Sequence, residues 1–247
     1  MPESPNVAQF RAARTDPALA VLEGFHAIKH AIRFGAEFEM IAARDLNELQ
    51  GFIAQLAPDV GARLMSTVSA VPAGLFDQLS PTPPETGVIA IAKRRITSAE
   101  QLAALPRNAP IVLLESPSHS GNIGAVIRVS AGAGAAAVVT TGPNDPWNPG
   151  AIRGAAGLHY ALPVMRSESI AIPGRSLIAI HPDGDELNRY TIPDDAVLAF
   201  GTERAGLSDD LLGRATSRIR IPMEPGVSSL NLATSVAIVL YTWRLAR

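Results

Sequence analysis

Three segments in the second half of the chain carry polar side chains at positions where a ligand can bind. Asn122 and Arg128 lie in residues 121–128, which open a predicted helix, and Glu203 lies in a glycine-bounded loop after a predicted strand. Ser229 and Asn231 join the last predicted strand to the closing helix. Open parallel sheets bind ligands beyond the carboxyl ends of their strands. The pattern therefore indicates a polar ligand site, although Asn122 and Ser229 also suit helix caps and Glu203 a solvated loop.

Other chemistries lack the residues that they need. The chain has no cysteine, which excludes disulfides, thiolate metal ligands and cysteine nucleophiles. His119, His159 and His181 are scattered without the spacing of a zinc motif, so we expect no metal site. Ser118 and Ser120 flank His119 outside any G-x-S-x-G elbow, which argues against a hydrolase.

A glycine-rich stretch, residues 131–137, contains a G-x-G-x-x-A string that is typical of dinucleotide sites. That motif must follow a strand and open a helix. Here it closes a predicted helix and leads into a strand, so we interpret its small residues as close packing between the two elements.

The elements that must position the polar segments alternate between strand and helix. In the first half, the apolar spacing predicts helices over residues 19–35, 45–56, 73–79 and 98–105, and strands over 38–43, 63–68 and 88–92. In the second half it predicts helices over residues 121–131 and 229–245, and strands over 111–115, 136–140, 177–181, 196–200 and 218–222.

This alternation predicts an α/β fold, with a mostly parallel sheet in the second half that is covered on both faces. Residues 106–110 form the best linker, which predicts two domains over residues 1–105 and 106–247. The first residues, up to about residue 15, are polar and are predicted to be frayed.

The three polar segments together resemble the signature motifs of the SpoU (TrmH) family of RNA ribose 2′-O-methyltransferases, within the SPOUT superfamily. The N-x-G-x-x-x-R string begins at Asn122, and the G-x-E-x-x-G-L-S string begins at Gly201. The I-P-M…S-L-N string runs from Ile221 to Asn231. Residues 148–164 look like the segment that joins the first two motifs in this family.

The resemblance covers residues 108–247 firmly and extends more weakly to residues 21–28. Two positions depart from the family pattern. Arg204 stands where many members have glycine, and Ser228 stands where they have glutamate or an apolar residue. These departures bear on the substrate class more than on the chemistry.

The resemblance implies a C-terminal trefoil knot in the α/β domain, an obligate homodimer, and S-adenosylmethionine bound in a bent conformation. It also implies that the small N-terminal α/β domain is similar to a ribosomal-protein fold and binds the RNA substrate. The cofactor-binding residues that it implies are Thr140, Thr141, Gly201, Ile221, Met223 and Leu230.

The catalytic set that the resemblance implies is Asn122, Arg128, Glu203, Ser229 and Asn231. Methyl transfer needs a methyl group in line with a positioned nucleophile, and an acceptor for its proton. Because a guanidinium stays protonated, we expect Arg128 to clamp an RNA phosphate rather than act as a base. Asn122 would orient Arg128 or the target nucleotide, and Glu203 would pair with Arg128 or with the substrate. Ser229 and Asn231 would complete the polar wall.

Net charge by itself points away from nucleic acid, because it is −2 with an isoelectric point near 6.2. Only Lys29 and Lys93 are lysines among the cations, and arginine suits phosphate recognition, although codon bias explains a high arginine content equally well. Lys93, Arg94 and Arg95 form a local basic cluster that either contacts RNA or is a solvated surface run.

These observations predict a cytoplasmic, homodimeric RNA 2′-O-methyltransferase that acts on structured RNA, with rRNA favoured over tRNA. The sequence shows no export signal and no apolar run near the ~20 residues of a membrane span. The alternative is a catalytically silent knot-fold RNA-binding or ribosome-assembly factor. A third possibility, a small-molecule nucleotide-binding enzyme, would turn over without RNA.

Overall fold

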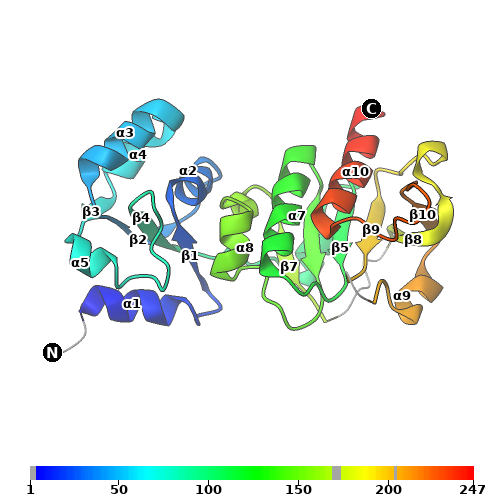
Figure 1. Cartoon of the computed structure of the whole chain (residues 1–247), viewed down its shortest axis with the longest axis horizontal. Coiled ribbons are helices and arrows are strands. Elements are labelled where there is room, and N and C mark those ends of the chain that lie inside the picture. The colour runs from blue at the N-terminus through cyan, green and yellow to red at the C-terminus, as the bar shows by residue number, and fades with distance from the viewer. Residues whose placement is uncertain (1–3, 169–173, 203–204) are drawn as a thin grey trace. The chain divides into compact units, whose positions relative to one another are not determined.

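The chain divides into two compact units, which the computed structural model describes over residues 4–168, 174–202 and 205–247 (Figure 1). The first unit comprises Met1–Arg95 and Trp147–Ala161, and the second comprises Ile96–Pro146 and Leu162–Arg247. The chain therefore leaves the second unit after Pro146 and returns to it at Leu162. The apolar pattern of the sequence gives no sign of this excursion.

The first unit is built on a four-stranded sheet with the order β1-β4-β2-β3. The strands are β1 (Leu19–Glu23), β2 (Phe38–Ala43), β3 (Val68–Ala70) and β4 (Val88–Lys93). Strand β4 is antiparallel to both β1 and β2, whereas β3 is parallel to β2. The helices are α1 (Pro5–Ala13), α2 (Phe25–Arg33), α3 (Leu46–Leu56), α4 (Gly61–Met65), α5 (Ala73–Phe76) and α8 (Pro149–Gly154), with the 3-10 turns η1 (Pro58–Val60) and η2 (Leu158–Tyr160).

Three local predictions for this unit are wrong. Residues 19–23 form a strand and not the start of a helix, because they are mostly buried and pair along their length with β4. Gly24 then separates β1 from α2 with a φ of 93°, which favours glycine. Residues 63–65 belong to α4 and only Val68 lies in a strand, β3, and residues 5–13 form α1 rather than a frayed end, with Phe10 fully buried in the core.

The second unit contains a six-stranded sheet in which every adjacent pair is parallel, with the order β10-β8-β9-β5-β6-β7. This confirms the predicted parallel sheet. The strands are β5 (Ile111–Leu114), β6 (Ala137–Thr140), β7 (Val164–Arg166), β8 (Ser176–Glu186), β9 (Ala196–Phe200) and β10 (Ser217–Arg220). The helices are α6 (Ala99–Ala103), α7 (Ser120–Ala133), α9 (Asp209–Arg214) and α10 (Leu232–Leu245), with the 3-10 turn η3 (Leu187–Arg189).

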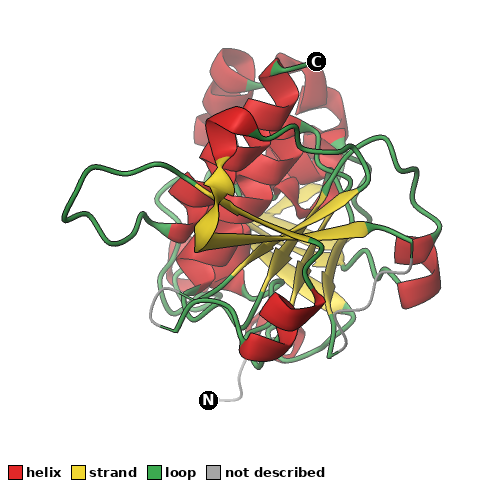
Figure 2. Cartoon of the chain, turned by 90° about the vertical axis from the view of Figure 1, so that its right-hand side faces the viewer, coloured by secondary structure: helices red, strands yellow, loops and turns green. Residues whose placement is uncertain are grey.

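Both faces of the parallel sheet are buried, as strand alternation requires. Ile111 and Leu113 pack in one cluster with Leu102 of α6 and Leu211 of α9. Alternate positions of β5 point to the opposite face, where α7 and α10 pack against each other (Figure 1). Figure 2 shows the strands in yellow with the twist of an open sheet. Over the described residues, no helix is long and apolar enough to cross a membrane.

Residues 147–161 are fixed to the first unit by backbone contacts that leave little freedom. His30 donates from Nδ1 to the carbonyl of Ala156 at 2.8 Å. A Cβ atom at Gly157, whose φ is 74°, would lie 2.2 Å from the carbonyl oxygen of Ala27, so only glycine fits there. The hydroxyl of Tyr160 donates to the carbonyl of Lys93 at 3.0 Å.

A buried carboxylate adds an electrostatic tie between the same segment and β1. Only 2% of the Glu23 side chain is exposed, and it accepts hydrogen bonds from Arg14 and Ser80 at 2.7 Å each and from Arg153 of α8. Burial by itself raises the pKa of Glu23, but the hydrogen bonds from Ser80, Arg14 and Arg153 outweigh it and hold the pKa below the usual value.

We predict that Glu23→Gln destabilises the first unit by about 2–3 kcal/mol, because it removes charged hydrogen bonds and leaves two arginines without their carboxylate. Since the folded-state pKa is depressed, the stabilisation is present above the ordinary pKa of 4.5 and is lost as the pH falls through the folded-state value. Calorimetric unfolding between pH 7 and pH 3 checks both points. Equal pH dependence in the wild type and the variant would contradict the assignment.

Candidate functional site

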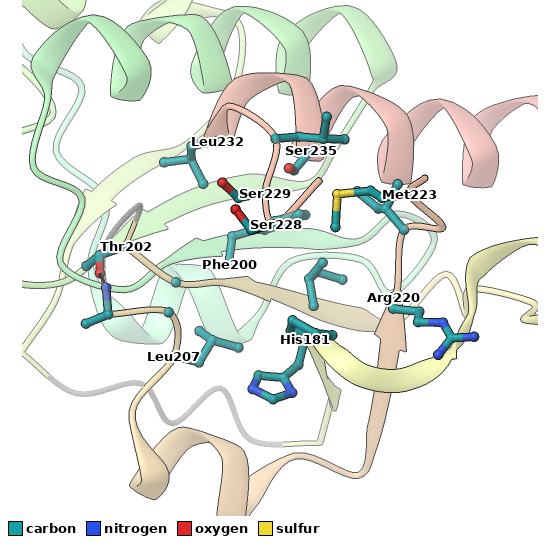
Figure 3. Close-up of a pocket in the computed structure, with 17 residues that line it drawn as sticks. His181, Phe200, Thr202, Leu207, Arg220, Met223, Ser228, Ser229, Leu232 and Ser235 are labelled. Carbon is teal, nitrogen blue, oxygen red and sulfur yellow. Dashed lines mark hydrogen bonds between the residues drawn. The ribbon is translucent and has the colours of Figure 1, made fainter. Parts of the chain in front are cut away.

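A cavity of about 380 Å³ lies in the second unit at the carboxyl ends of β9 and β10 and beside residues 180–182 of β8, the strand between them (Figure 3). This volume falls in the range of small-molecule sites. Its apolar lining consists of Ile180, Pro182, Phe200, Ala205, Leu207, Ile221, Met223, Leu230 and Leu232. Its polar and glycine lining consists of His181, Gly201, Thr202, Gly206, Arg220, Ser228, Ser229 and Ser235. An apolar pocket with a few convergent polar groups suits an organic ligand with polar substituents.

A bulge in β8 supplies one wall of the cavity. Ala179 pairs with Arg218 of β10, but the next residue of β10, Ile219, pairs with Asp185. The intervening residues of β8 therefore leave the ladder, and Ile180, His181 and Pro182 line the cavity. A Cβ atom at Gly184 would lie 2.4 Å from the carbonyl carbon of Arg218, so glycine is required where the bulge returns to the ladder.

The loop after β9 supplies the second wall and is folded tightly on itself. The backbones of Thr202 and Gly206 exchange two hydrogen bonds of 3.1 Å. A Cβ atom at Gly201 would lie 2.1 Å from the carbonyl carbon of Gly206, so this close approach depends on glycine. Ala205 donates its backbone N–H to the Thr202 hydroxyl at 2.9 Å. Glu203, predicted to be catalytic, lies outside the described residues, as does Arg204.

The segment between β10 and α10 supplies the third wall. Ser228, Ser229 and Leu230 line the cavity and are exposed. Across the described residues, their backbone groups hydrogen-bond to no other part of the chain. Because backbone N–H and C=O groups need partners when they are removed from water, this stretch can bind the polar edge of a ligand.

Two of the predicted catalytic residues are joined directly. Asn231 caps α10 by accepting through Oδ1 from the backbone N–H groups of Ala233 at 2.9 Å and Thr234 at 3.4 Å. Its Nδ2 donates to Oδ1 of Asn122, in the first turn of α7, at 3.1 Å. Asn231 therefore caps α10, whereas neither Asn122 nor Ser229, the two caps that the sequence suggested, is an N-cap. The same Asn231 side chain holds the starts of α7 and α10 together.

Arg128 lies further along α7 and is exposed. It is six residues beyond Asn122, so the two side chains leave the helix about 120° apart. The Arg128 side chain forms no hydrogen bond or ion pair with the residues that the structure describes. Its guanidinium is therefore available to a ligand.

The predicted cofactor residues fall into two groups. Gly201, Ile221, Met223 and Leu230 line the cavity together with Ser229. Thr140 and Thr141 are buried and are not among the lining residues. The hydroxyl oxygen of Thr141 accepts from the backbone N–H of Ser116 at 3.0 Å, which fixes the loop before α7. A cofactor role for the two threonines stays a prediction.

The predicted RNA-binding cluster is partly engaged within the first unit. Lys93 pairs with Glu37 at 2.9 Å, and Arg94 donates from Nε to the carbonyl of Leu19 at 2.5 Å. Arg95 donates to the carbonyls of Tyr160 at 2.6 Å and Phe34 at 2.8 Å. These arginines therefore have a structural role, and RNA contact by the cluster stays a prediction.

Sequence reasoning missed several residues of the cavity. His181 appeared only as a scattered histidine, yet it is the last residue of the predicted strand over residues 177–181, at the end where ligands bind. In Figure 3, Phe200 lies between Ser228 and Ser229 on one side and Leu207 and His181 on the other. Arg220, which also lines the cavity, pairs with Glu186 at 2.9 Å and lowers the pKa of that carboxylate.

Residues 109–241 match the family model described as "SpoU rRNA Methylase family". The "23S rRNA (adenosine(1067)-2'-O)-methyltransferase" of Streptomyces laurentii is 30% identical over 234 residues, which is 90% of this chain and 84% of that protein. The "23S rRNA (guanosine(2553)-2'-O)-methyltransferase RlmP" of Bacillus subtilis is 28% identical over 146 residues, 54% of this chain and 57% of that protein.

The fold is shared with the SpoU methyltransferase AviRb from Streptomyces viridochromogenes, solved with the cofactor AdoMet. The TM-score is 0.80 at 21% identity, and the alignment covers 98% of each chain. The family model spans more than half of this chain, and the Streptomyces laurentii relative aligns along most of both proteins. The chain therefore belongs to the SpoU rRNA methylase family of S-adenosylmethionine-dependent RNA 2′-O-methyltransferases.

Proposed function

We propose that this chain methylates a ribose 2′-hydroxyl of ribosomal RNA and binds S-adenosylmethionine in the cavity beyond β8, β9 and β10. One observation carries the proposal: the cavity is lined by the two C-terminal motif segments and by the β8 bulge at one edge of the parallel sheet. The relatives described above are named as rRNA methyltransferases, which favours an enzyme over the silent RNA-binding alternative. Because those relatives modify different bases, the target nucleotide stays open.

The residues of the cavity fit the cofactor. Phe200, Leu207 and Leu230 offer apolar contact to an adenine ring. The backbone of residues 228–230, which bonds to none of the described residues, offers hydrogen bonds to the edge of that ring. When bound, S-adenosylmethionine supplies an electrophilic methyl group. The protein's part is then to bind, to orient and to exclude water.

Arg128 is the residue that we assign to the RNA. Its exposed guanidinium has donors available for a phosphate, which it would bind bidentately and so position the 2′-oxygen. The positive charge of Arg128 lowers the pKa of the ribose 2′-hydroxyl beside it. The proton of that hydroxyl then leaves to a phosphate oxygen or to water. Asn122 and Asn231 hold the starts of α7 and α10, and Ser229 and Asn231 complete the polar wall. We assign to Glu203 the role of pairing with Arg128 or with the substrate.

Three further features belong to this proposal. The first unit is the RNA-binding domain and the second is the methyltransferase domain. The C-terminal part of the methyltransferase domain forms a trefoil knot, and two copies of the chain form a homodimer in the cytoplasm. The family membership supports these features.

We predict that Gly201→Ala raises the dissociation constant for S-adenosylmethionine about 10- to 100-fold, because a methyl group there forces the Gly206 backbone to move at a cost of ~1–3 kcal/mol. Gly213→Ala in α9 is the matched control, since a Cβ there has no neighbour within 4 Å. Isothermal titration of each variant checks the assignment. Unchanged affinity in Gly201→Ala would place the cofactor elsewhere.

We predict that Arg128→Lys lowers turnover at saturating RNA by about tenfold or more, because lysine keeps the charge but loses the bidentate fork. S-adenosylmethionine affinity should not change. Arg214→Lys, at an exposed arginine of α9 that pairs with Asp210, serves as the control. Tritium transfer to rRNA measures turnover, and near-wild-type turnover in Arg128→Lys would exclude the clamp.

We predict that Asn231→Asp separates the capping role from the active-site role. Aspartate caps helices as well as asparagine does, so the melting temperature should stay near that of the wild type, whereas Asn231→Ala should lose ~1 kcal/mol. Aspartate cannot donate to Asn122, so methyl transfer should fall in both variants. Full activity in Asn231→Asp would limit this residue to capping.

A further inference from the structure

A carboxylate outside the cavity ties together the two ends of the loop that lines it. Glu115 directly follows β5, and its backbone N–H donates to the carbonyl of Phe200, the last residue of β9, at 2.9 Å. Its side chain accepts from the backbone N–H of Ser208 at 2.7 Å and from the Ser208 hydroxyl at 2.6 Å. The loop between Phe200 and Ser208 is therefore anchored at its start and at its end by one residue.

Ser208 connects the Glu115 anchor to the start of helix α9. Its hydroxyl donates to Glu115 and accepts from the backbone N–H of Leu211 at 3.3 Å, so it also caps α9. Both bonds to Glu115 have an ionised acceptor, which makes them stronger than neutral hydrogen bonds. Within the described parts of the chain, Glu115 forms no ion pair, so its carboxylate serves this loop.

The described residues of this loop, 201–202 and 205–207, have few other hydrogen bonds. Internally it is closed by the Thr202–Gly206 pair and the bond from Ala205 to the Thr202 hydroxyl. Thr202, Ala205 and Gly206 are exposed or half-buried. A short exposed loop with few internal bonds needs external attachments to keep one conformation.

We propose that Glu115 is a positioning residue that holds the two ends of this loop, at Phe200 and Ser208, where its described residues line the cofactor cavity, although Glu115 itself does not line the cavity. This inference rests on the proposed function, since it takes the cavity as the site of S-adenosylmethionine. Glu115 acts on affinity through the fraction of molecules whose loop is competent to bind. Removing the anchor lowers that fraction and raises the apparent dissociation constant by the same factor.

The test compares Glu115→Ala, Glu115→Gln, Ser208→Ala and the double variant Glu115→Ala/Ser208→Ala in the full chain. Asp210→Asn is the matched control, because it removes a carboxylate from the first turn of α9 that pairs along the helix with Arg214. Isothermal titration with S-adenosylmethionine and with S-adenosylhomocysteine measures affinity. Hydrogen exchange without ligand reports on the Gly206 and Ser208 amides.

We expect Glu115→Ala to weaken the binding of both ligands about tenfold, because the fraction of molecules whose loop can bind falls to about one tenth of its wild-type value. Glu115→Gln keeps an acceptor for one bond and should lie between Glu115→Ala and the wild type. Ser208→Ala should have a smaller effect, and less than a twofold effect when Glu115 is already alanine. The Gly206 and Ser208 amides should lose protection from hydrogen exchange in Glu115→Ala, while the β9 amides of that variant keep theirs. Asp210→Asn should keep wild-type affinity and wild-type protection.

Wild-type affinity in Glu115→Ala, in a chain whose wild type binds S-adenosylmethionine, would overturn this inference alone. Additive effects of Glu115→Ala and Ser208→Ala would also overturn it, because the two groups would then act separately. A lower melting temperature of Glu115→Ala with unchanged affinity would show that Glu115 stabilises the fold and does not position the loop. Failure of the wild type to bind S-adenosylmethionine would instead contradict the proposed function.

Discussion

The parallel pairing of β10, β8, β9 and β5 is the constraint on which the site depends. Parallel strands deliver their carboxyl ends to one edge of the sheet, so the segments that follow β9 and β10 meet there beside the bulge of β8, although the three lie far apart in the sequence. The neighbouring strand β5 contributes through Glu115, which reaches the loop after β9. No single segment forms the cavity; it exists only because strand pairing brings these segments together.

Close approach of backbones is the second requirement, and three glycines satisfy it. Gly201 lets the loop after β9 fold onto Gly206, and Gly184 lets the β8 bulge return against Arg218. Gly157 does the same for residues 147–161 against Ala27 in the first unit. In each case a Cβ atom would overlap the opposing backbone, which cannot move without disturbing the element that it belongs to.

Side chains with two roles connect the helices to the chemistry. Asn231 caps α10 with its oxygen and bonds Asn122 with its nitrogen, so the start of the closing helix and the start of α7 are positioned together. Ser208 caps α9 while it donates to Glu115. A structural explanation and a functional explanation of such a residue are therefore not alternatives, because the cap fixes the geometry that the site uses.

The sequence by itself determined the α/β class, the parallel sheet and the family, because apolar strands and motif spacing are local properties. It also indicated Gly201, Ile221, Ser229 and Leu230, which lie within those motifs. It could not show that residues 19–23 are a strand, since a run of four buried residues and one half-buried residue fits both periods until β4 pairs with it. Only the tertiary structure revealed the β8 bulge with His181, the assignment of residues 147–161 to the first unit, and the Glu115 anchor. Each of these depends on residues that are distant in sequence and become neighbours only when the sheets form.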